Sequence, residues 1–225
     1  MSETNHSKLA PRIQHPGDGF IKCEFCGREH WGLNGAAGIL VARKVQSSRS
    51  SSNISQRSDS DTEIIKNNIS QTKNDDRIKV GTSTENYKSK NADSNEVTHL
   101  LLQLRAPWVT HGETWGIPGG ALADGESDLE GALREAYEEA GIKPEQIRIV
   151  DQIIRDHKNW HFTTILALEN PQDPITPVNL DHEALETRWI RLEELPNLKL
   201  MHHFDQEIKE LTERLNTDAK YLDSI

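Results

Sequence analysis

The sequence predicts an α/β fold, a sandwich of mixed strands and two helices that is interrupted by a long disordered insertion. Three observations support this prediction. Strand-like and helix-like segments alternate along the chain. Two windows have the spacing of apolar residues that is typical of amphipathic helices. A polar stretch at residues 45–96 separates the first two strand-like segments.

The strand-like segments are rich in β-branched and aliphatic residues, which favour an extended chain on a sheet. They span residues 33–43, 97–105, 146–155, 162–168 and 188–192. We expect the first two to pair as a hairpin around the insertion, because the entropic cost of closing a loop grows only slowly with its length. A later helix is predicted over residues 205–215, where Ile208, Leu211 and Leu215 recur at helical spacing.

Another helix is predicted over residues 128–140. Ser127 followed by Glu130 has the pattern of a capping box, in which the serine oxygen accepts a backbone N–H and the glutamate reaches back to the cap. Gly141 is placed to end the helix in a left-handed turn. An apolar stripe would bury this helix against the sheet; it consists of Leu129, Ala132, Leu133, Ala136 and Ala140.

Three glutamates share one face of this predicted helix. Glu135, Glu138 and Glu139 are three and four residues apart, which brings their carboxylates together. Like charges at this spacing repel, so they need a compensating cation, and clustered carboxylates suit Mg²⁺ or Mn²⁺. A bare E-x-x-E-E pattern is more often a solvated acidic face, so the surrounding residues decide between the two interpretations.

Those surrounding residues form a specific pattern. The spacing G-x5-E-x7-R-E-A-x-E-E-x-G-I is filled by Gly120, Glu126, Arg134, Glu135, Glu138, Glu139 and Gly141. This arrangement resembles the signature of the Nudix hydrolases, which cleave nucleoside diphosphates linked to a further group. The resemblance implies the Nudix α/β/α fold over about residues 33–216. It also implies that residues 115–120 (WGIPGG) form the strand and glycine turn before this segment, which we call the Nudix box (residues 120–142).

The resemblance implies a role for the central box residues. The Gly119 carbonyl oxygen, Glu138 and Glu139 would hold the divalent metal, Mg²⁺ or Mn²⁺. Glu135 would act as the general base or as a further metal ligand. Arg134 would orient Glu135 through a charge-assisted hydrogen bond.

The remaining box residues would have supporting roles. Glu126, together with Gly120 and Gly141, would stabilise the loop and helix that carry the ligands. Many Nudix hydrolases recruit one more carboxylate from a later loop. Glu186 is the stronger candidate for it here and Glu183 the weaker; the alternative is a surface acid that faces water.

The function implied is Mg²⁺-dependent hydrolysis of a pyrophosphate bond in a nucleotide or nucleoside-diphosphate derivative, by attack of water on phosphorus. Candidate substrates are nucleoside triphosphates, oxidised nucleotides, ADP-ribose, dinucleoside polyphosphates and capped or sugar nucleotides. The alternative is a catalytically silent Nudix module that senses a nucleotide. Damage to the box would favour that alternative, and the box is intact.

A second motif lies near the N-terminus. Cys23 and Cys26 form a C-x2-C knuckle, and His30 follows it. This is part of a zinc-binding pattern, for which a tetrahedral site needs a fourth ligand. The chain has only two cysteines, so the fourth ligand would be His15, another histidine or a carboxylate. The alternative is a pair of reduced cysteines in a turn.

Length and composition suggest how the 225 residues are organised. Residues 45–96 are rich in Ser, Asn, Asp and Lys, so they are too polar to bury a core, and we expect a disordered insertion there. We expect residues 1–32 to form an N-terminal tail that carries the knuckle. Residues 33–216 would be the interrupted Nudix domain, and residues 217–225 a C-terminal tail.

Charge and hydropathy exclude some partners. A net charge of −10 argues against a role in coating nucleic acid or binding an anionic membrane, because both depend on excess Lys and Arg. No apolar stretch approaches the length of a membrane span, and the N-terminus lacks a hydrophobic signal region. We therefore expect a cytoplasmic protein whose partner is a small-molecule nucleotide. A homodimer is left open.

Overall fold

The computed structural model describes residues 16–44 and 96–222. Apart from Glu96, the insertion predicted at residues 45–96 lies outside these ranges, and so does His15, one of the candidate fourth ligands.

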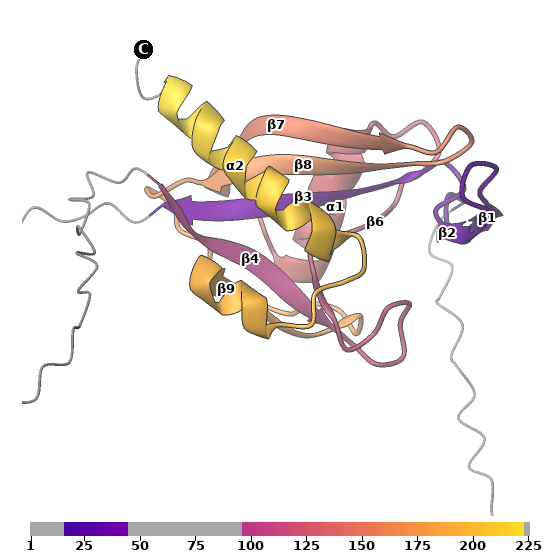
Figure 1. Ribbon diagram of the computed structural model, residues 1–225, viewed down its shortest axis with the longest axis horizontal. Helices are drawn as coiled ribbons and strands as arrows, with labels where there is room; N and C mark the ends of the chain where they lie inside the picture. The colour runs from indigo at the N-terminus through magenta and orange to yellow at the C-terminus, as the bar shows by residue number, and fades with distance from the viewer. Residues whose placement is uncertain (1–15, 45–95, 223–225) are drawn as a thin grey trace, which may run out of the picture. The chain divides into compact units, whose positions relative to one another are not determined.

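A mixed sheet of seven strands forms the centre of the described part of the chain (Figure 1). The strands are β3 (Ala36–Lys44), β4 (Val97–Arg105), β5 (Trp115–Gly116), β6 (Gly119–Ala121), β7 (Ile147–Asp156), β8 (His161–Glu169) and β9 (Ala184–Arg191). The main path runs β5-β4-β3-β8-β7, with β6 beside β3 and β9 beside β4. β3 and β8 are parallel and the other pairs are antiparallel, so the sheet is mixed as predicted.

Strand β3 positions the Nudix box. One of its edges pairs with β8, whereas the other edge is shared by two strands. Residues 36–38 of β3 pair with β6, and residues 42–44 pair with β4, which is the pairing expected around the insertion. Because β6 leads directly into the box, the start of the box is held by hydrogen bonds to the middle of the sheet.

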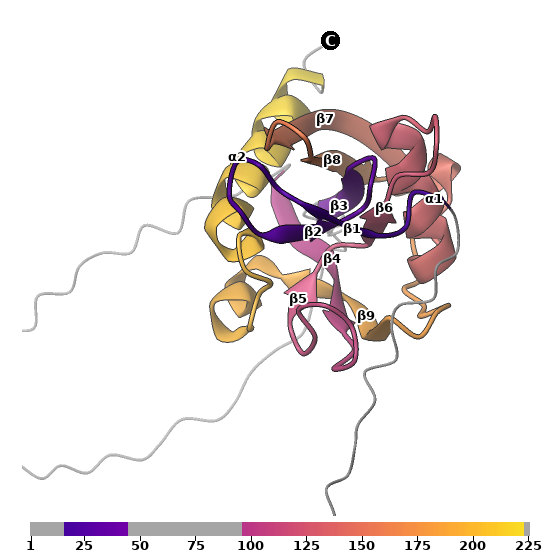
Figure 2. The same ribbon diagram turned by 90° about the vertical axis from the view of Figure 1, so that its right-hand side faces the viewer.

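Helices α1 (Asp128–Ala140) and α2 (Phe204–Leu222) cover opposite faces of the sheet (Figure 2). Short 3₁₀ turns η1 (Pro144–Gln146) and η2 (Leu192–Asn197) follow α1 and β9. The core under α1 includes Ile39, Val41, Leu101, Ala132, Ala136 and Ile165. The core under α2 includes Leu40, Leu100, Leu166, Ile190, Leu211 and Leu215. This alternation along the strands confirms the α/β/α sandwich.

Some element boundaries differ from the sequence-based expectation. β9 begins at Ala184 rather than at residue 188, because it pairs with β4 along almost the whole length of that strand. α2 continues past residue 215 to Leu222. Leu129 is 38% exposed although it belongs to the apolar stripe, so the burial of α1 depends on its alanines.

Two short strands precede the main sheet. β1 (Phe20–Lys22) and β2 (Glu29–Trp31) form an antiparallel hairpin within the stretch expected to be a tail. The hairpin contacts the turn between β7 and β8, where the indole N–H of Trp160 donates to the Trp31 carbonyl over 3.1 Å. No helix in the described residues is long and apolar enough to span a membrane.

Candidate active site

The box helix begins and ends with strong local signals. The backbone N–H of Glu130 donates to Oγ of Ser127, while Oε2 of Glu130 accepts from the Ser127 backbone N–H over 2.9 Å, so both halves of the capping box are present. Gly141 ends the helix with φ of 66°, a left-handed conformation in which glycine has no Cβ penalty. These caps fix where α1 starts and therefore which side chains face the loop before it.

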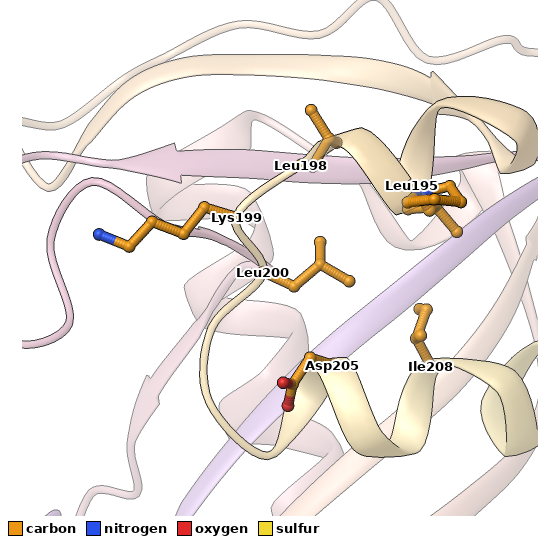
Figure 3. A pocket seen from close by; sticks show the side chains of 7 residues that line it. Leu195, Leu198, Lys199, Leu200, Asp205 and Ile208 are labelled. Carbon is orange, nitrogen blue, oxygen red and sulfur yellow. The ribbon is translucent and has the colours of Figure 1, made fainter.

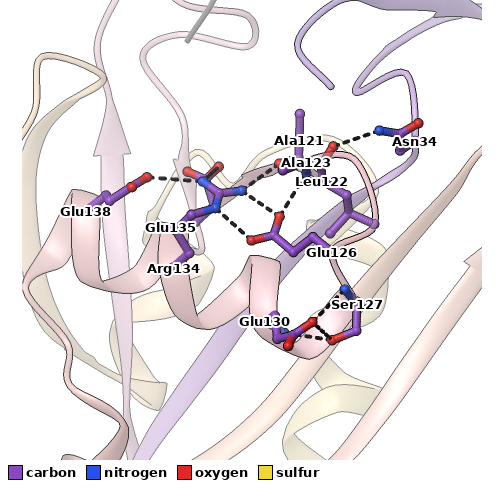
Figure 4. A network of polar contacts seen from close by, with 10 residues as sticks. All are labelled: Asn34, Ala121, Leu122, Ala123, Glu126, Ser127, Glu130, Arg134, Glu135 and Glu138. Atoms are coloured by element: carbon purple, nitrogen blue, oxygen red, sulfur yellow. Dashed lines mark hydrogen bonds and ion pairs between the residues drawn. The ribbon is translucent and has the colours of Figure 1, made fainter. Parts of the chain in front are cut away.

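Arg134 is the centre of the polar network in the box (Figure 4). Its guanidinium donates to both carboxylate oxygens of Glu126, over 2.8 and 2.9 Å. It also donates to Oε1 of Glu135 over 2.7 Å, to Oε2 of Glu138 over 3.1 Å and to the Ala121 carbonyl over 2.9 Å. The Arg134 guanidinium therefore links α1 to the loop before it, and it also binds two carboxylates of α1 itself.

Glu139 is the most buried of the box glutamates, with only 5% of its surface exposed. Its Oε2 accepts the backbone N–H of Gly119 over 3.0 Å, so the carboxylate is directed toward β6. Burial raises the pKa of Glu139 well above its ordinary value, and the nearby charge of Glu135 raises it further. One backbone donor does not replace the water that this carboxylate loses.

Glu135 lies between Arg134 and β6. Burial raises the pKa of Glu135 to about 7, although the hydrogen bond and charge of Arg134 act in the opposite direction. Glu138 adds to the rise through its like charge. The side chain of Glu138 itself is 53% exposed, so the three carboxylates range from the surface to the interior.

Gly120 leaves room for the Glu135 carboxylate. A Cβ on Gly120 would lie 2.5 Å from Oε1 of Glu135, a distance that requires the carboxylate to move. We expect Gly120→Ala to lower activity by about 10- to 100-fold, because misplacing a reacting group by about 1 Å has an effect of this size. Gly116→Ala is the matched control, since a Cβ there meets Met201 only at 3.6 Å. Steady-state kinetics would contradict this account if both variants retained full turnover.

The two candidates for an extra carboxylate occupy different surroundings. Oε1 of Glu186 pairs with the guanidinium of Arg188 at 3.2 Å, and the Glu186 side chain is 49% exposed. Glu183, in contrast, is among the charges that raise the pKa of Glu135. Burial also raises the pKa of Glu183, with Arg105 opposing and Asp181 adding to the rise. The charge of Asp181 also raises the pKa of Glu139. Asp181 was not among the candidate residues predicted from the sequence.

Two buried polar side chains face the same side of the sheet as α1. Gln103 on β4 and Thr187 on β9 are cross-strand partners. Side chains two residues apart on a strand lie on the same face of the sheet. Gln103 is two residues from Leu101 and Thr187 is two residues from Trp189, and both Leu101 and Trp189 pack in the core under α1. In the described part of the chain, Nε2 of Gln103 and Oγ1 of Thr187 have no hydrogen-bond partner. A polar residue inside the apolar run of residues 100–104 was the signal available in the sequence.

A separate groove lies on the α2 side, with a volume of about 490 Å³ (Figure 3). It is lined by Leu195, Pro196, Leu198, Lys199, Leu200, Asp205 and Ile208. None of these is a box residue, so the groove does not contribute to the candidate active site.

The N-terminal knuckle forms its own cluster. Cys23, Cys26 and His30, the three residues that the sequence grouped, lie together in the β1–β2 hairpin. His157, from the turn between β7 and β8, joins them. The fourth ligand was left open among His15, another histidine and a carboxylate, because His157 is 134 residues away from Cys23 along the chain.

Comparisons with known proteins agree with this architecture. A family model described as NUDIX domain matches residues 92–212, more than half of the chain. A nucleoside triphosphate pyrophosphatase/Nudix hydrolase fusion protein of Bifidobacterium longum is 38% identical over 203 residues, covering 89% of this chain and 32% of the relative. A putative 8-oxo-dGTP diphosphatase 3 of Mycobacterium tuberculosis is 34% identical over 107 residues, covering 45% of this chain and 48% of the relative.

The chain thus spans about a third to a half of the length of these two relatives. Among solved structures, the Nudix hydrolase RenU from M. smegmatis matches with a TM-score of 0.57 and 24% identity, over 87% of this chain and 95% of that one. That likeness supports the fold. The family model matches more than half of the chain, and the chain therefore belongs to the NUDIX domain family.

Proposed function

We propose that the protein hydrolyses a pyrophosphate bond in a nucleotide or nucleoside-diphosphate derivative and that it requires Mg²⁺ or Mn²⁺. The observation that carries this proposal is the placement of the buried Glu139 and the largely buried Glu135 in a cluster where Arg134 is the partner cation of three box glutamates, Glu126, Glu135 and Glu138. Buried like charges without a matching cation raise one another's pKa and cost stability. A divalent ion would remove that cost.

The donor set suits such an ion. Carboxylate oxygens of Glu135, Glu138 and Glu139, with the carbonyl oxygen of Gly119, would hold a hard divalent cation. When bound, the ion would neutralise phosphate oxygens and lower the pKa of a coordinated water. Arg134 would keep the carboxylates in place, because its hydrogen bonds fix Glu135 and Glu138 on the helix and tie the helix to Glu126.

Glu135 is our candidate for the general base. It lies beside Glu138 and Glu139 in the cluster that would hold the metal, where a coordinated water would lie within reach of its carboxylate. Arg134 contacts Oε1 of Glu135, and among the described residues no hydrogen bond reaches Oε2, so that oxygen can accept a proton from water. Glu183 is the better placed candidate for the extra carboxylate, because its charge acts on Glu135 whereas Glu186 pairs with Arg188.

The substrate would meet polar groups beside the carboxylates. The charge of Arg105 acts on both Glu139 and Glu183, so a phosphate near the cluster would also be near this guanidinium. Because the name of the M. tuberculosis relative mentions 8-oxo-dGTP, we place oxidised nucleotides first among the candidate substrates.

The raised pKa of Glu135 predicts a pH-dependent effect of the metal. In the metal-free fold the carboxyl is held protonated up to a pKa of about 7, above its ordinary 4.5. Stability therefore falls as pH rises through this window, by about 3 kcal/mol in total from this group. Because Mg²⁺ would offset the charge, we expect it to raise the Tm more at pH 8 than at pH 5. Equal shifts at both pH values in differential scanning calorimetry would contradict this.

A substrate panel tests the proposed function. Nucleoside triphosphates, oxidised dGTP, ADP-ribose, dinucleoside polyphosphates and NADH would be incubated with the protein and Mg²⁺ or Mn²⁺, and product release followed by chromatography. We expect one substrate class to be cleaved only when the metal is present. Binding of a nucleotide without cleavage of any of them would replace this proposal with the silent sensing module.

A further inference from the structure

Four side chains of types that can bind a metal ion converge outside the Nudix box. Cys23, Cys26 and His30 come from the β1–β2 hairpin, and His157 comes from the turn between β7 and β8. Their ligand atoms all lie within 4.8 Å of one another. None of the four takes part in the box network around Arg134, so the proposed hydrolysis leaves this cluster unexplained.

The spacing of the ligand atoms fits a tetrahedral ion. Sγ of Cys26 lies 3.1 Å from Nε2 of His30, and Sγ of Cys23 lies 3.5 Å from Nδ1 of His157. In tetrahedral zinc sites the bonds are about 2.3 Å to sulfur and about 2.0–2.1 Å to nitrogen, so neighbouring ligand atoms should be about 3.3–3.8 Å apart. Small adjustments of the side chains would bring all four atoms to these distances.

The backbone of the knuckle is arranged for a thiolate ligand. The N–H of Cys26 donates to Sγ of Cys23 over 3.3 Å. The N–H of Gly27 returns to the Cys23 carbonyl over 3.0 Å, and Gly27 takes φ of 71°, which suits glycine. Donors directed at a sulfur stabilise its deprotonated form, which is the form that binds metal.

The two sides of the cluster are held together by contacts that involve no metal. The Asn159 side chain accepts the N–H of Glu24 over 2.9 Å and donates to the Lys22 carbonyl over 3.0 Å. The His30 ring stacks on the Trp160 ring, with centroids 4.0 Å apart and planes 9° from parallel. These contacts position His157 beside the cysteines in advance, which lowers the entropic cost of assembling a site.

From this geometry we propose that Cys23, Cys26, His30 and His157 bind one structural zinc ion. Two thiolates and two imidazoles in a tetrahedral arrangement are a donor set that favours zinc, and four protein ligands leave no open position for substrate. The ion clamps the N-terminal hairpin to the turn between β7 and β8. This proposal does not depend on the hydrolytic activity proposed for the box.

The clamp has a structural connection to the box. Strand β8 begins four residues after His157, and its first residue, His161, contacts Oδ1 of Asp128 over 2.9 Å at the start of α1. After the hairpin, Asn34 donates to Oδ1 of Asp124 in the box loop over 2.8 Å. Fixing the hairpin therefore stabilises two segments that touch the box, without supplying a group to the chemistry.

Metal analysis of the 225-residue chain without a tag tests the proposal. After expression with zinc and exhaustive dialysis, we expect about one zinc per chain by inductively coupled plasma mass spectrometry. Replacement by Co²⁺ should give the absorption bands of a tetrahedral ion together with a sulfur-to-cobalt charge-transfer band, which the carboxylates of the box cannot produce. No bound zinc, or a cobalt spectrum without the charge-transfer band, would overturn the proposal.

Variants identify the ligands. We expect His157→Gln and Cys26→Ser each to weaken zinc binding by more than about 100-fold. Removing a residue that only hydrogen-bonds to a metal ligand already lowers metal affinity by about 10- to 100-fold. His202→Gln, an exposed histidine outside the cluster, is the matched control and should keep full zinc. Circular dichroism would establish that each variant is folded. A folded His157→Gln protein that binds zinc as tightly as the unaltered chain would exclude the clamp.

A thiol assay separates the clamp from a redox pair. With zinc bound, both cysteines should react slowly with a thiol reagent, and a zinc-selective chelator in the presence of excess Mg²⁺ should restore fast reaction and lower the Tm. Mass spectrometry that finds a Cys23–Cys26 disulfide in the protein as purified, without zinc, would contradict the proposal and indicate a redox function instead.

Discussion

Replacing Glu139 by glutamine should lower turnover by about 100-fold or more while leaving the metal-free fold intact. Glutamine has nearly the same shape as glutamate, and its carbonyl oxygen can still accept the Gly119 N–H that now reaches Oε2 of Glu139. The substitution removes only the negative charge. If that charge helps to hold the metal, binding of Mn²⁺ should weaken together with turnover.

The same substitution should stabilise the metal-free protein at alkaline pH. Burial raises the pKa of Glu139, so ionising it in the folded state is costly above its ordinary titration range. A neutral glutamine avoids this cost, and we expect a higher Tm than that of the unaltered chain at pH 8 without metal. Loss of activity with gain of stability is a combination that general misfolding would not produce.

Glu145→Gln is the matched control, because Glu145 is an exposed glutamate in η1. It should change neither turnover nor Mn²⁺ affinity. Kinetics and calorimetry on the same preparations would check both expectations. Full turnover in Glu139→Gln would remove Glu139 from the proposed metal site.

Replacing Arg134 by alanine should destabilise the fold by about 3 kcal/mol at pH 8, because the loss of one partner leaves largely buried carboxylates uncompensated. Glu126 and Glu135 are the main groups affected; their side chains are 13% and 15% exposed and both accept hydrogen bonds from the guanidinium. Activity should fall as well, since Glu135 loses the group that orients it.

The loss should be smaller at pH 5. Without Arg134 the folded-state pKa of Glu135 rises further, because the hydrogen bond and charge that lower it are lost, so the folded variant binds protons that relieve the repulsion as pH falls. Urea unfolding at both pH values would measure the difference. Arg148→Ala, an exposed arginine on β7, serves as the control. An equal loss for Arg134→Ala at pH 5 and pH 8 would contradict the electrostatic account.

Local signals predicted α1 accurately. Its capping box and terminal glycine act within a few residues, so residues 128–140 could be identified as a helix from sequence alone. β4 was also predicted with its observed bounds, because an apolar run at residues 100–102 dominates the strand. The bounds of these two elements are set by their own residues more than by tertiary contacts with other elements.

Other features depend on tertiary contacts that have no sequence pattern. The β1–β2 hairpin is short, with three residues in each strand, and it is held by Trp160 and Asn159 from another part of the chain. His157 reaches the cysteines across the same contact. The surroundings of Glu183 and Glu186 differ because the loop before β9 folds toward α1 whereas β9 itself places Glu186 beside Arg188.

In the proposed reaction the box carboxylates support attack of water on phosphorus with the help of a divalent metal. Hydrolysis of the best substrate of the panel in ¹⁸O-labelled water, analysed by mass spectrometry, tests this most directly. We expect one ¹⁸O atom in a phosphate group of one product, formed only with Mg²⁺ or Mn²⁺ and lost in Glu139→Gln. Cleavage that persists without metal, or products whose phosphates carry no label, would contradict it.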